Sequence, residues 1–229
     1  PRQLVDEIIV VDAGSADATV AVARKSGARV VVERRKGYGR ACAAGVNATR
    51  TDIVAFLDGD GSDDSADLAR VLGPLIERPV DLVLGSRSHV EGGAMPFYAR
   101  LGNIFAAALI SLWWGQKVTD LPSCKAIRRQ DLLALGMVEE KYGWTIELIV
   151  KAARGGFRIE EVPLTYRARR GGKSKVSGNL RASVKAAFSI LRVLVEHGFG
   201  PITAGTGDRP KLLDAPDQPG IASKDPSQG

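Results

Sequence analysis

Short apolar runs rich in β-branched residues alternate, along the first half of the chain, with segments whose apolar residues recur at helical spacing. This alternation predicts βαβ units with right-handed crossovers, and therefore a mostly parallel sheet flanked by helices. Ligands of such sheets bind beyond the carboxyl ends of the strands. The expected strands are residues 8–11, 28–32, 53–57 and 81–85, and the expected helices are residues 19–26, 38–48 and 66–76.

The second half of the chain has fewer strand-like runs and longer helical patterns. Because Pro, Gly, Asp and Ser dominate from residue 201 onward, we expect one domain over residues 1–200 and a disordered tail over residues 201–229. The expected elements are helices at 98–114, 145–154 and 180–196, a short segment at 119–128 and a strand at 158–166.

The composition fits one soluble globular domain, since 45% of the 229 residues are hydrophobic and 25% are charged. The formal net charge of +6 indicates an anionic partner, such as a nucleotide diphosphate, a lipid phosphate, an acidic membrane surface or nucleic acid. The apolar run 104–114 is about half of the roughly 20 residues that cross a bilayer, so we expect no transmembrane helix. Cys42 and Cys124 have no paired ligand spacing, which favours buried free thiols in a reducing cytoplasm.

The sharpest chemical signal is the acidic turn Asp58-Gly59-Asp60, which follows an expected buried strand. Carboxylates two residues apart can point into one pocket, and together with a substrate diphosphate they would suit Mg²⁺ or Mn²⁺. The alternative is a solvated Asp-Gly turn that caps the next helix. We expect Asp63 and Asp64 to be capping and surface residues rather than metal ligands.

A second signal joins a strand end, a tight turn and a helix start, and it contains Asp12, Gly14 and Ser15. This turn would lie on the same rim of the sheet as the acidic turn. The alternative is that Ser15 or Asp17 only caps the helix.

The order of these motifs resembles family 2 of the glycosyltransferases. The turn after the first strand resembles the Asp-Asp-Gly-Ser turn of that family, and Asp58-Gly59-Asp60 resembles its Asp-x-Asp metal motif. The resemblance covers nearly all residues before the tail, and its later motifs are most similar to the dolichyl- and polyprenyl-phosphate mannose or glucose synthases. These later motifs are residues 85–87, 119–120, 161–167 and 170–175.

The resemblance implies an α/β fold of the GT-A type, the Rossmann-like fold of nucleotide-diphospho-sugar transferases. It also implies an inverting hexosyltransferase that moves a sugar from a UDP- or GDP-linked donor to a phosphate-bearing acceptor such as polyprenyl or dolichyl phosphate. Asp58 and Asp60 would hold Mg²⁺ or Mn²⁺ and would bind the nucleotide sugar together with Asp12, Gly14 and Ser15. The acceptor and phosphate contacts would be Arg87, Arg100, Arg170, Lys173, Ser174 and Lys175, the last four in a loop that closes over phosphates.

Two departures from the family pattern affect the donor site. Ala13 stands where many relatives carry a second Asp that contacts the base, so the nucleotide stays open. The opening strand of the family, with its Pro-x-x-Asn-Glu motif, would precede Pro1, and we expect the chain to need that segment for activity.

The acceptor decides whether the reaction needs a general base. Charge develops on the leaving diphosphate, where a divalent cation held by Asp60 and nearby Lys and Arg side chains would stabilise it. A phosphate acceptor has a second pKa near about 6 and is already anionic at neutral pH. A hydroxyl acceptor would need a base, for which Asp120 is the candidate; otherwise Asp120 caps the turn before Pro122.

Other functions stay open at this point. They are a soluble transferase with a small hydroxyl or phosphate acceptor, a nucleotidyltransferase, and a non-catalytic module that binds sugar nucleotides. The basic loop 170–175 lacks the interleaved aromatic residues of nucleic-acid platforms, so no nucleic-acid partner is expected. Helix 180–196 carries basic residues beside an apolar stripe, which would permit peripheral contact with the cytoplasmic face of a membrane. The alternative is that its apolar stripe packs on the domain core. The oligomeric state stays open.

Four further residues have a structural interpretation. We expect Trp144 in the core and Glu147 in a surface ion pair, with a place in the acceptor cavity as the alternative for both. His89 and His197 are the only histidines, and we expect both on the surface.

Overall fold

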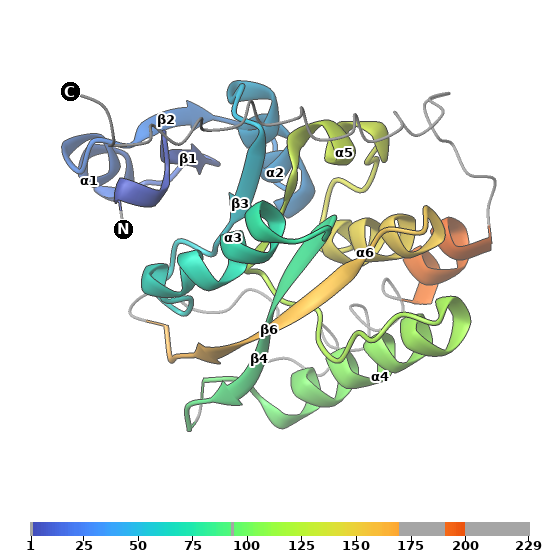
Figure 1. The fold of residues 1–229 in the computed structure, drawn as a ribbon. Coiled ribbons are helices and arrows are strands. Elements are labelled where there is room, and N and C mark those ends of the chain that lie inside the picture. The colour runs from blue at the N-terminus through green and yellow to red at the C-terminus, as the bar shows by residue number, and fades with distance from the viewer. Residues whose placement is uncertain (1, 93, 170–190, 200–229) are drawn as a thin grey trace, which may run out of the picture.

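The computed structural model describes residues 2–92, 94–169 and 191–199. Its strands form a two-stranded sheet, β1-β2, and a four-stranded sheet in the order β3-β5-β4-β6. Helices surround these strands (Figure 1), which confirms the expected α/β class. The strands are β1 (Ile9–Asp12), β2 (Arg29–Val32), β3 (Ile53–Phe56), β4 (Leu82–Val90), β5 (Lys125–Arg128) and β6 (Ile159–Tyr166).

Most strands share one direction within their sheet. β1 pairs with β2 in parallel, and β4 pairs with β6 in parallel. β5 lies between β3 and β4 and is antiparallel to both, so β3, β4 and β6 run the same way. The carboxyl ends of β3, β4 and β6 therefore lie toward one edge of the larger sheet.

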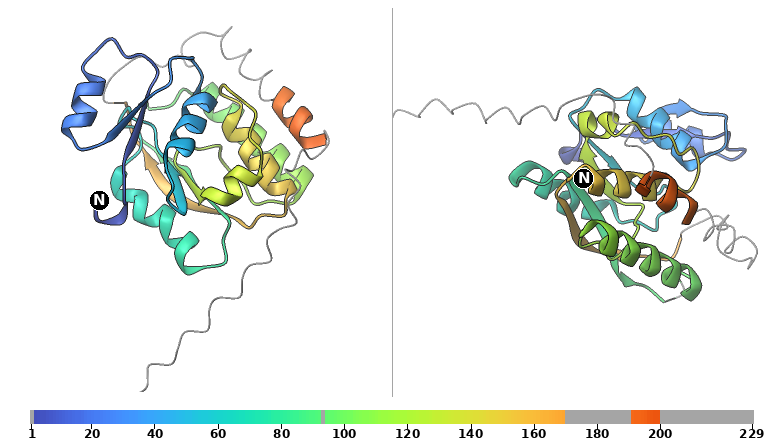
Figure 2. Two further views of the ribbon diagram at one scale, coloured as in Figure 1. Left: turned by 90° about the horizontal axis from the view of Figure 1, so that it is seen from above. Right: turned by 90° about the vertical axis from the view of Figure 1, so that its right-hand side faces the viewer.

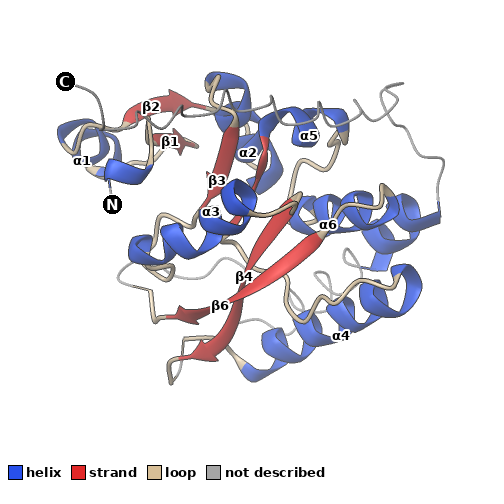
Figure 3. Cartoon of the chain, in the orientation of Figure 1, coloured by secondary structure: helices blue, strands red, loops and turns tan. Residues whose placement is uncertain are grey.

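Helices cover both faces of the larger sheet (Figures 2 and 3). Successive side chains of a strand point to opposite faces, and β4 shows this directly. Leu82 and Leu84 pack into a core shared with α2, α4 and α6, whereas Val83 packs into a core shared with α3. The helical elements are η1 (Arg2–Leu4), α1 (Thr19–Lys25), α2 (Tyr38–Ala48), η2 (Ser65–Asp67), α3 (Leu68–Glu77), α4 (Phe97–Trp114), α5 (Arg129–Ala134) and α6 (Trp144–Arg154).

Three elements differ from the sequence prediction. β4 continues to Val90 rather than ending at residue 85, because its pairing with β6 resumes after a register shift between Ser86 and His89. The segment expected at 119–128 contains a true strand, β5, which is antiparallel and buried. A short helix, α5, follows it at once.

Residues 191–199 are helical, which agrees with the end of the helix expected at 180–196. The remainder of that helix, the basic loop with Arg170, Lys173, Ser174 and Lys175, and the tail 201–229 lie outside the described residues. Among the residues that the structure describes, no helix is both long enough and apolar enough to cross a bilayer.

Candidate active site

The acidic turn is shaped by its own side chains. β3 ends at Phe56, and the chain then turns through Asp58 and Asp60 to Gly61, whose φ of 80° favours glycine. Asp60 Oδ1 accepts hydrogen bonds from the amide of Ser62 at 3.0 Å and from its hydroxyl at 2.6 Å. Ser62 thus fixes one oxygen of Asp60.

Asp58 lies in a crowded, partly buried environment. Burial and the nearby charges of Asp63 and Asp60 raise the pKa of its carboxyl group. In the described part of the chain, no donor forms a hydrogen bond with its carboxylate oxygens. Two neighbouring carboxylates that repel one another are a donor set that suits a hard divalent cation.

Asp63 connects two segments of the site through hydrogen bonds, whereas we expected it to be a capping or surface residue. Its Oδ2 accepts hydrogen bonds from the amide of Asp58 and from the hydroxyl of Ser123, both at 3.0 Å. It therefore ties the acidic turn to the segment before β5. Asp64 does cap, since it accepts from the amide of Ala66 at 2.9 Å.

Arginines that follow β6 lie over the acidic turn. The Arg169 guanidinium forms an ion pair with Asp60 Oδ2 at 3.1 Å, and the Arg167 guanidinium contacts Asp64 at 2.6 Å. The Arg167 amide also donates to the carbonyl of Ser62 at 3.0 Å. Arg169 therefore lies beside the acidic turn, and the predicted basic loop follows it in the sequence.

The turn after β1 is held by Asp12. Its buried carboxylate accepts hydrogen bonds from the amides of Gly14 at 3.0 Å and Ser15 at 3.1 Å. Hydrogen bonds from the side chain and amide of Ser15 lower the pKa of Asp12. Gly14 has a φ of 89°, which explains glycine at this position. Asp17, one of the two expected caps, accepts a hydrogen bond from the amide of Thr19 at 2.9 Å, although Ala18 occupies the N-cap position of α1.

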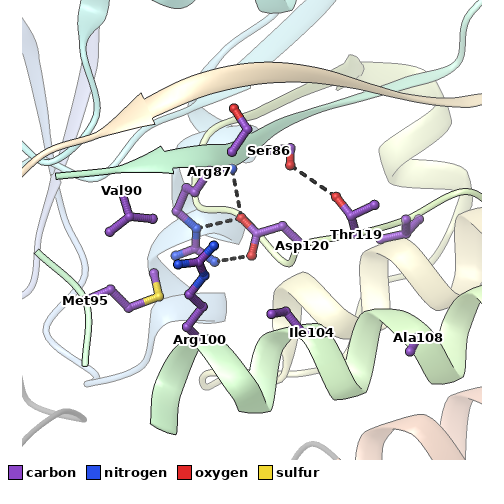
Figure 4. A pocket seen from close by; sticks show the side chains of 11 residues that line it. Ser86, Arg87, Val90, Met95, Arg100, Ile104, Ala108, Thr119 and Asp120 are labelled. Atoms are coloured by element: carbon purple, nitrogen blue, oxygen red, sulfur yellow. Dashed lines mark hydrogen bonds and ion pairs between the residues drawn. The ribbon is translucent and has the colours of Figure 1, made fainter. Parts of the chain in front are cut away.

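Arg87 and Asp120 form a buried ion pair in the third part of the site. Asp120 Oδ2 accepts from Arg87 Nε, and Asp120 Oδ1 from Arg87 Nη2, each at 2.7 Å (Figure 4). The amide of Arg87 also donates to Asp120 at 3.0 Å. Burial disfavours the ionised form of Asp120, but the hydrogen bonds and charge of Arg87 outweigh it and lower the pKa.

A cavity of about 410 Å³ opens beside this pair, between β4 and α4. Figure 4 shows the Arg100 side chain rising from α4 toward Arg87, so two guanidinium groups converge there. No carboxylate of the described residues pairs with Arg100. The remaining lining is largely apolar or hydroxyl-bearing: Ser86, Ser88, Val90, Met95, Ile104, Ala108, Val118 and Thr119.

Glu161 on β6 holds two residues that line the same cavity, Thr119 and Asp120. Its carboxylate accepts hydrogen bonds from the amide and hydroxyl of Thr119, at 2.7 and 2.6 Å, and from the amide of Asp120 at 3.2 Å. Glu161 belongs to a motif that resembles the family, but no role was predicted for it. The sequence feature that could have indicated one is a carboxylate on a strand that is followed by two arginines, Arg167 and Arg169.

Comparison with known proteins shows the family of this chain. The sequence model described as Glycosyl transferase family 2 matches residues 2–136. The chain belongs to that family. The glycosyltransferase class and the GT-A fold expected from the sequence are therefore confirmed.

Relatives of this family 2 glycosyltransferase include enzymes with lipid phosphates in their names. An uncharacterized glycosyltransferase of Mycobacterium tuberculosis is 42% identical over 186 residues, which are 81% of this chain and 85% of the relative. A dolichyl-phosphate hexose transferase of Haloferax volcanii is 37% identical over 165 residues, which are 72% of each chain.

A solved structure of similar fold is the glucosyl-3-phosphoglycerate synthase of Mycobacterium tuberculosis, in complex with Mn²⁺, UDP-glucose and phosphoglyceric acid. Its TM-score is 0.69 at 27% identity, and the match covers 85% of this chain and 69% of that one. The same synthase has been solved with Mg²⁺ and UDP.

Other polar residues of the glycosyltransferase belong to its framework. Trp144 lies in the core, as expected, but Glu147 is fully buried rather than in a surface ion pair. Glu147 accepts the amides of Val138 and Glu139 at 2.8 and 2.7 Å and pairs with Lys151 at 2.7 Å. The loop between α5 and α6 leaves these amides without backbone partners, so it requires such an acceptor.

Of the two histidines, His89 is exposed, as expected, but His197 is largely buried near Glu139 and Glu196. These three residues are the one group in the described part of the chain with three ligand atoms close enough for a metal ion. Arg192 already bridges the two carboxylates, with contacts of 2.6 Å to each, and offsets one of their two negative charges.

Proposed function

We propose that this family 2 enzyme transfers a hexose from a UDP- or GDP-linked donor to an oxygen of an acceptor phosphate, with inversion at the anomeric carbon. The observation that carries the proposal is the cavity beside β4. Its one carboxylate, Asp120, is committed to Arg87, while the guanidinium groups of Arg87 and Arg100 converge on the space. Two guanidinium groups on one side of a cavity attract an anion.

On the donor side, Asp58 and Asp60 would hold Mg²⁺ or Mn²⁺, as the complexes of the solved relative support. The metal, when bound, supplies positive charge to the leaving diphosphate. Asp60 would release Arg169 to bind the metal, and the freed guanidinium could then bind a phosphate oxygen. Asp12, Gly14 and Ser15 would contact the nucleotide from the preformed turn after β1.

On the acceptor side, an anionic phosphate oxygen would attack the anomeric carbon, and the electron pair of the broken bond would leave with the nucleoside diphosphate. This nucleophile needs no base. Asp120 would be a poor base, because Arg87 stabilises its ionised form and lowers its pKa. We therefore assign Asp120 the task of orienting Arg87, in place of the proton abstraction that a hydroxyl acceptor would require.

The surface of α4 supports a lipid as the carrier of that phosphate. Phe97, Leu101, Phe105 and Leu112 follow one another at helical spacing and are all exposed. Arg100 and Ile104 from the same helix line the cavity. An apolar stripe beside a cationic cavity suits a polyprenyl phosphate whose chain remains in a membrane surface.

A small phosphorylated acceptor is the second candidate, because the solved relative was crystallised with phosphoglyceric acid. The natural full-length protein, supplied with Mn²⁺ and UDP- or GDP-linked hexoses, distinguishes the two. We expect transfer to undecaprenyl phosphate in detergent and none to undecaprenol. Transfer to 3-phosphoglycerate alone would favour the small acceptor, and transfer to undecaprenol would contradict attack by phosphate.

Arg100 tests the acceptor site within the same assay. Arg100→Gln should raise the KM for undecaprenyl phosphate about tenfold or more, because a hydrogen bond to a charged group contributes about 1.5–3 kcal/mol. The KM for the donor should stay unchanged. Arg70→Gln is the matched control, since Arg70 is an exposed arginine of α3 that pairs only with Asp67 at 3.3 Å. Equal acceptor KM values in the two variants would contradict the assignment of Arg100.

A further inference from the structure

Lys125, which has no predicted role, is a fully buried lysine next to the acidic turn. It opens β5, and its side chain has no exposed surface. In the antiparallel pairing it lies opposite Phe56, the last residue of β3 before the chain reaches Asp58. The ammonium group therefore lies behind the acidic turn, inside the protein.

Among the described residues, the ammonium donates its hydrogen bonds to uncharged oxygens. Lys125 Nζ donates to the carbonyls of Pro122 at 2.9 Å and Ser123 at 2.8 Å, and to the hydroxyl of Thr145 at 3.1 Å. The rings of Tyr38, Phe56 and Trp144 enclose it, with centroids 5.7 to 5.9 Å from Nζ. No carboxylate of the described residues forms an ion pair with it.

Such an arrangement is unfavourable for folding. A buried charge without an opposite partner has lost its hydration, and an apolar side chain of similar volume often gives equal or greater stability. The three aromatic rings around Nζ would accommodate methionine, whose unbranched apolar side chain resembles the aliphatic part of lysine. Stability of the fold therefore does not account for the lysine.

The hydrogen bonds of Lys125 connect it to the acidic turn and to the segment that follows Asp120. The ammonium fixes the carbonyl of Ser123, whose hydroxyl donates to Asp63, and Asp63 in turn holds the amide of Asp58. The ammonium also fixes the carbonyl of Pro122, two residues after Asp120. One side chain thus sets the acidic turn and the segment that carries the partner of Arg87.

The charge of Lys125 acts in the same direction as its hydrogen bonds. Burial lowers the pKa of Lys125, whereas the charges of Asp58 and Asp63 oppose that shift. The protonated side chain offsets part of the repulsion between these two carboxylates. It also favours the negative charge of a diphosphate drawn to the turn by a metal ion.

We propose that Lys125 is a positioning residue for the metal–diphosphate site, holding the Asp58–Asp60 turn through Ser123 and Asp63 and balancing its charge from behind. This role rests on the proposed function, in which the turn binds a divalent cation with the donor diphosphate. Lys125 does not contact the reacting atoms.

Lys125→Met tests the proposal by binding rather than by turnover. Mn²⁺ affinity is measured by electron paramagnetic resonance in the presence of UDP or GDP, whichever the wild-type protein binds more tightly. We expect a melting temperature equal to or above that of the wild type, and Mn²⁺ affinity about tenfold weaker, as for other residues that orient metal ligands. Lys117→Met, on an exposed lysine of a nearby loop, should change neither quantity.

Unchanged Mn²⁺ affinity in folded Lys125→Met would overturn the proposal, and so would a loss matched by Lys117→Met. If Lys125→Met does not fold, Ser123→Ala decides, because it removes only the hydroxyl bond to Asp63. It should weaken Mn²⁺ binding several-fold, and wild-type affinity would overturn the proposal. Absence of Mn²⁺ binding by the wild-type protein would instead contradict the proposed function.

Discussion

Two aspartate–arginine pairs flank the proposed reaction, and they differ in burial. Arg169 and Asp60 leave 37% and 20% of their side chains exposed, and a single 3.1 Å ion-pair contact joins them. Arg87 and Asp120 leave only 12% and 14% exposed, and their contact is bidentate. Exposed pairs are weak and exchange partners readily, whereas buried pairs are costly to break. The first pair can open for a metal ion, and the second is part of the framework.

Asp60→Asn should have the largest effect, because it removes a proposed metal ligand. We expect transfer to fall by at least about 100-fold, as when one group that stabilises developing charge is lost. Calorimetric titration should show that Mn²⁺ no longer strengthens UDP or GDP binding. Asp52→Asn, at an exposed aspartate before β3, is the control for the loss of one negative charge. Unchanged metal dependence in Asp60→Asn would exclude the turn as the metal site.

Asp120→Asn should mainly affect stability. Removal of one partner of a buried pair costs about 3 kcal/mol or more, which urea unfolding at pH 7 would measure. The folded-state pKa of Asp120 is lowered, so its stabilisation is present above the unfolded-state pKa and is lost as pH falls through the folded-state value. The difference between Asp120→Asn and wild type should therefore shrink below about pH 4.

The activity of Asp120→Asn separates the orienting role from that of a general base. With undecaprenyl phosphate, the pH dependence of kcat should keep its shape, although the acceptor KM rises as Arg87 loses its orientation. If Asp120 were the base, the variant would lose the rise of kcat with pH that its titration produces.

Features that depend on local sequence pattern were predictable from the sequence. The apolar runs located every strand except β5, and the acidic turn was evident from two carboxylates after a buried strand. Contacts distant in sequence were not predictable, as the bond between Asp63 and Ser123 illustrates. Lys125 begins a four-residue strand whose pairing with β3 and β4 is entirely non-local, and nothing in its neighbours along the chain indicates full burial.

Arg169→Gln should have a smaller effect, in the opposite direction to Asp60→Asn. Without its arginine, Asp60 Oδ2 is free for a cation, so affinity for Mn²⁺ alone should rise by up to about fivefold, the upper range for an exposed ion pair. Affinity for the nucleoside diphosphate in the presence of Mn²⁺ should fall, because the displaced guanidinium can no longer bind phosphate. Arg167→Gln, whose partners are Asp64 and Glu91, is the control. Weaker binding of Mn²⁺ alone by Arg169→Gln would contradict the exchange of partners.

Asp58→Asn should have the smallest effect on the fold, and its sign distinguishes the two regions. Burial and the charges of Asp63 and Asp60 disfavour ionised Asp58. In EDTA at pH 7, the neutral amide should therefore raise the melting temperature slightly, whereas Asp120→Asn lowers it. With Mn²⁺ and UDP or GDP added, the order should reverse, since only the wild-type turn gains binding energy from the complex. If Asp58 destabilises the free protein but stabilises its complex with Mn²⁺ and nucleotide, its role is in ligand binding rather than in folding. Equal melting temperatures of Asp58→Asn and wild type under both conditions would show that the turn is a solvated loop.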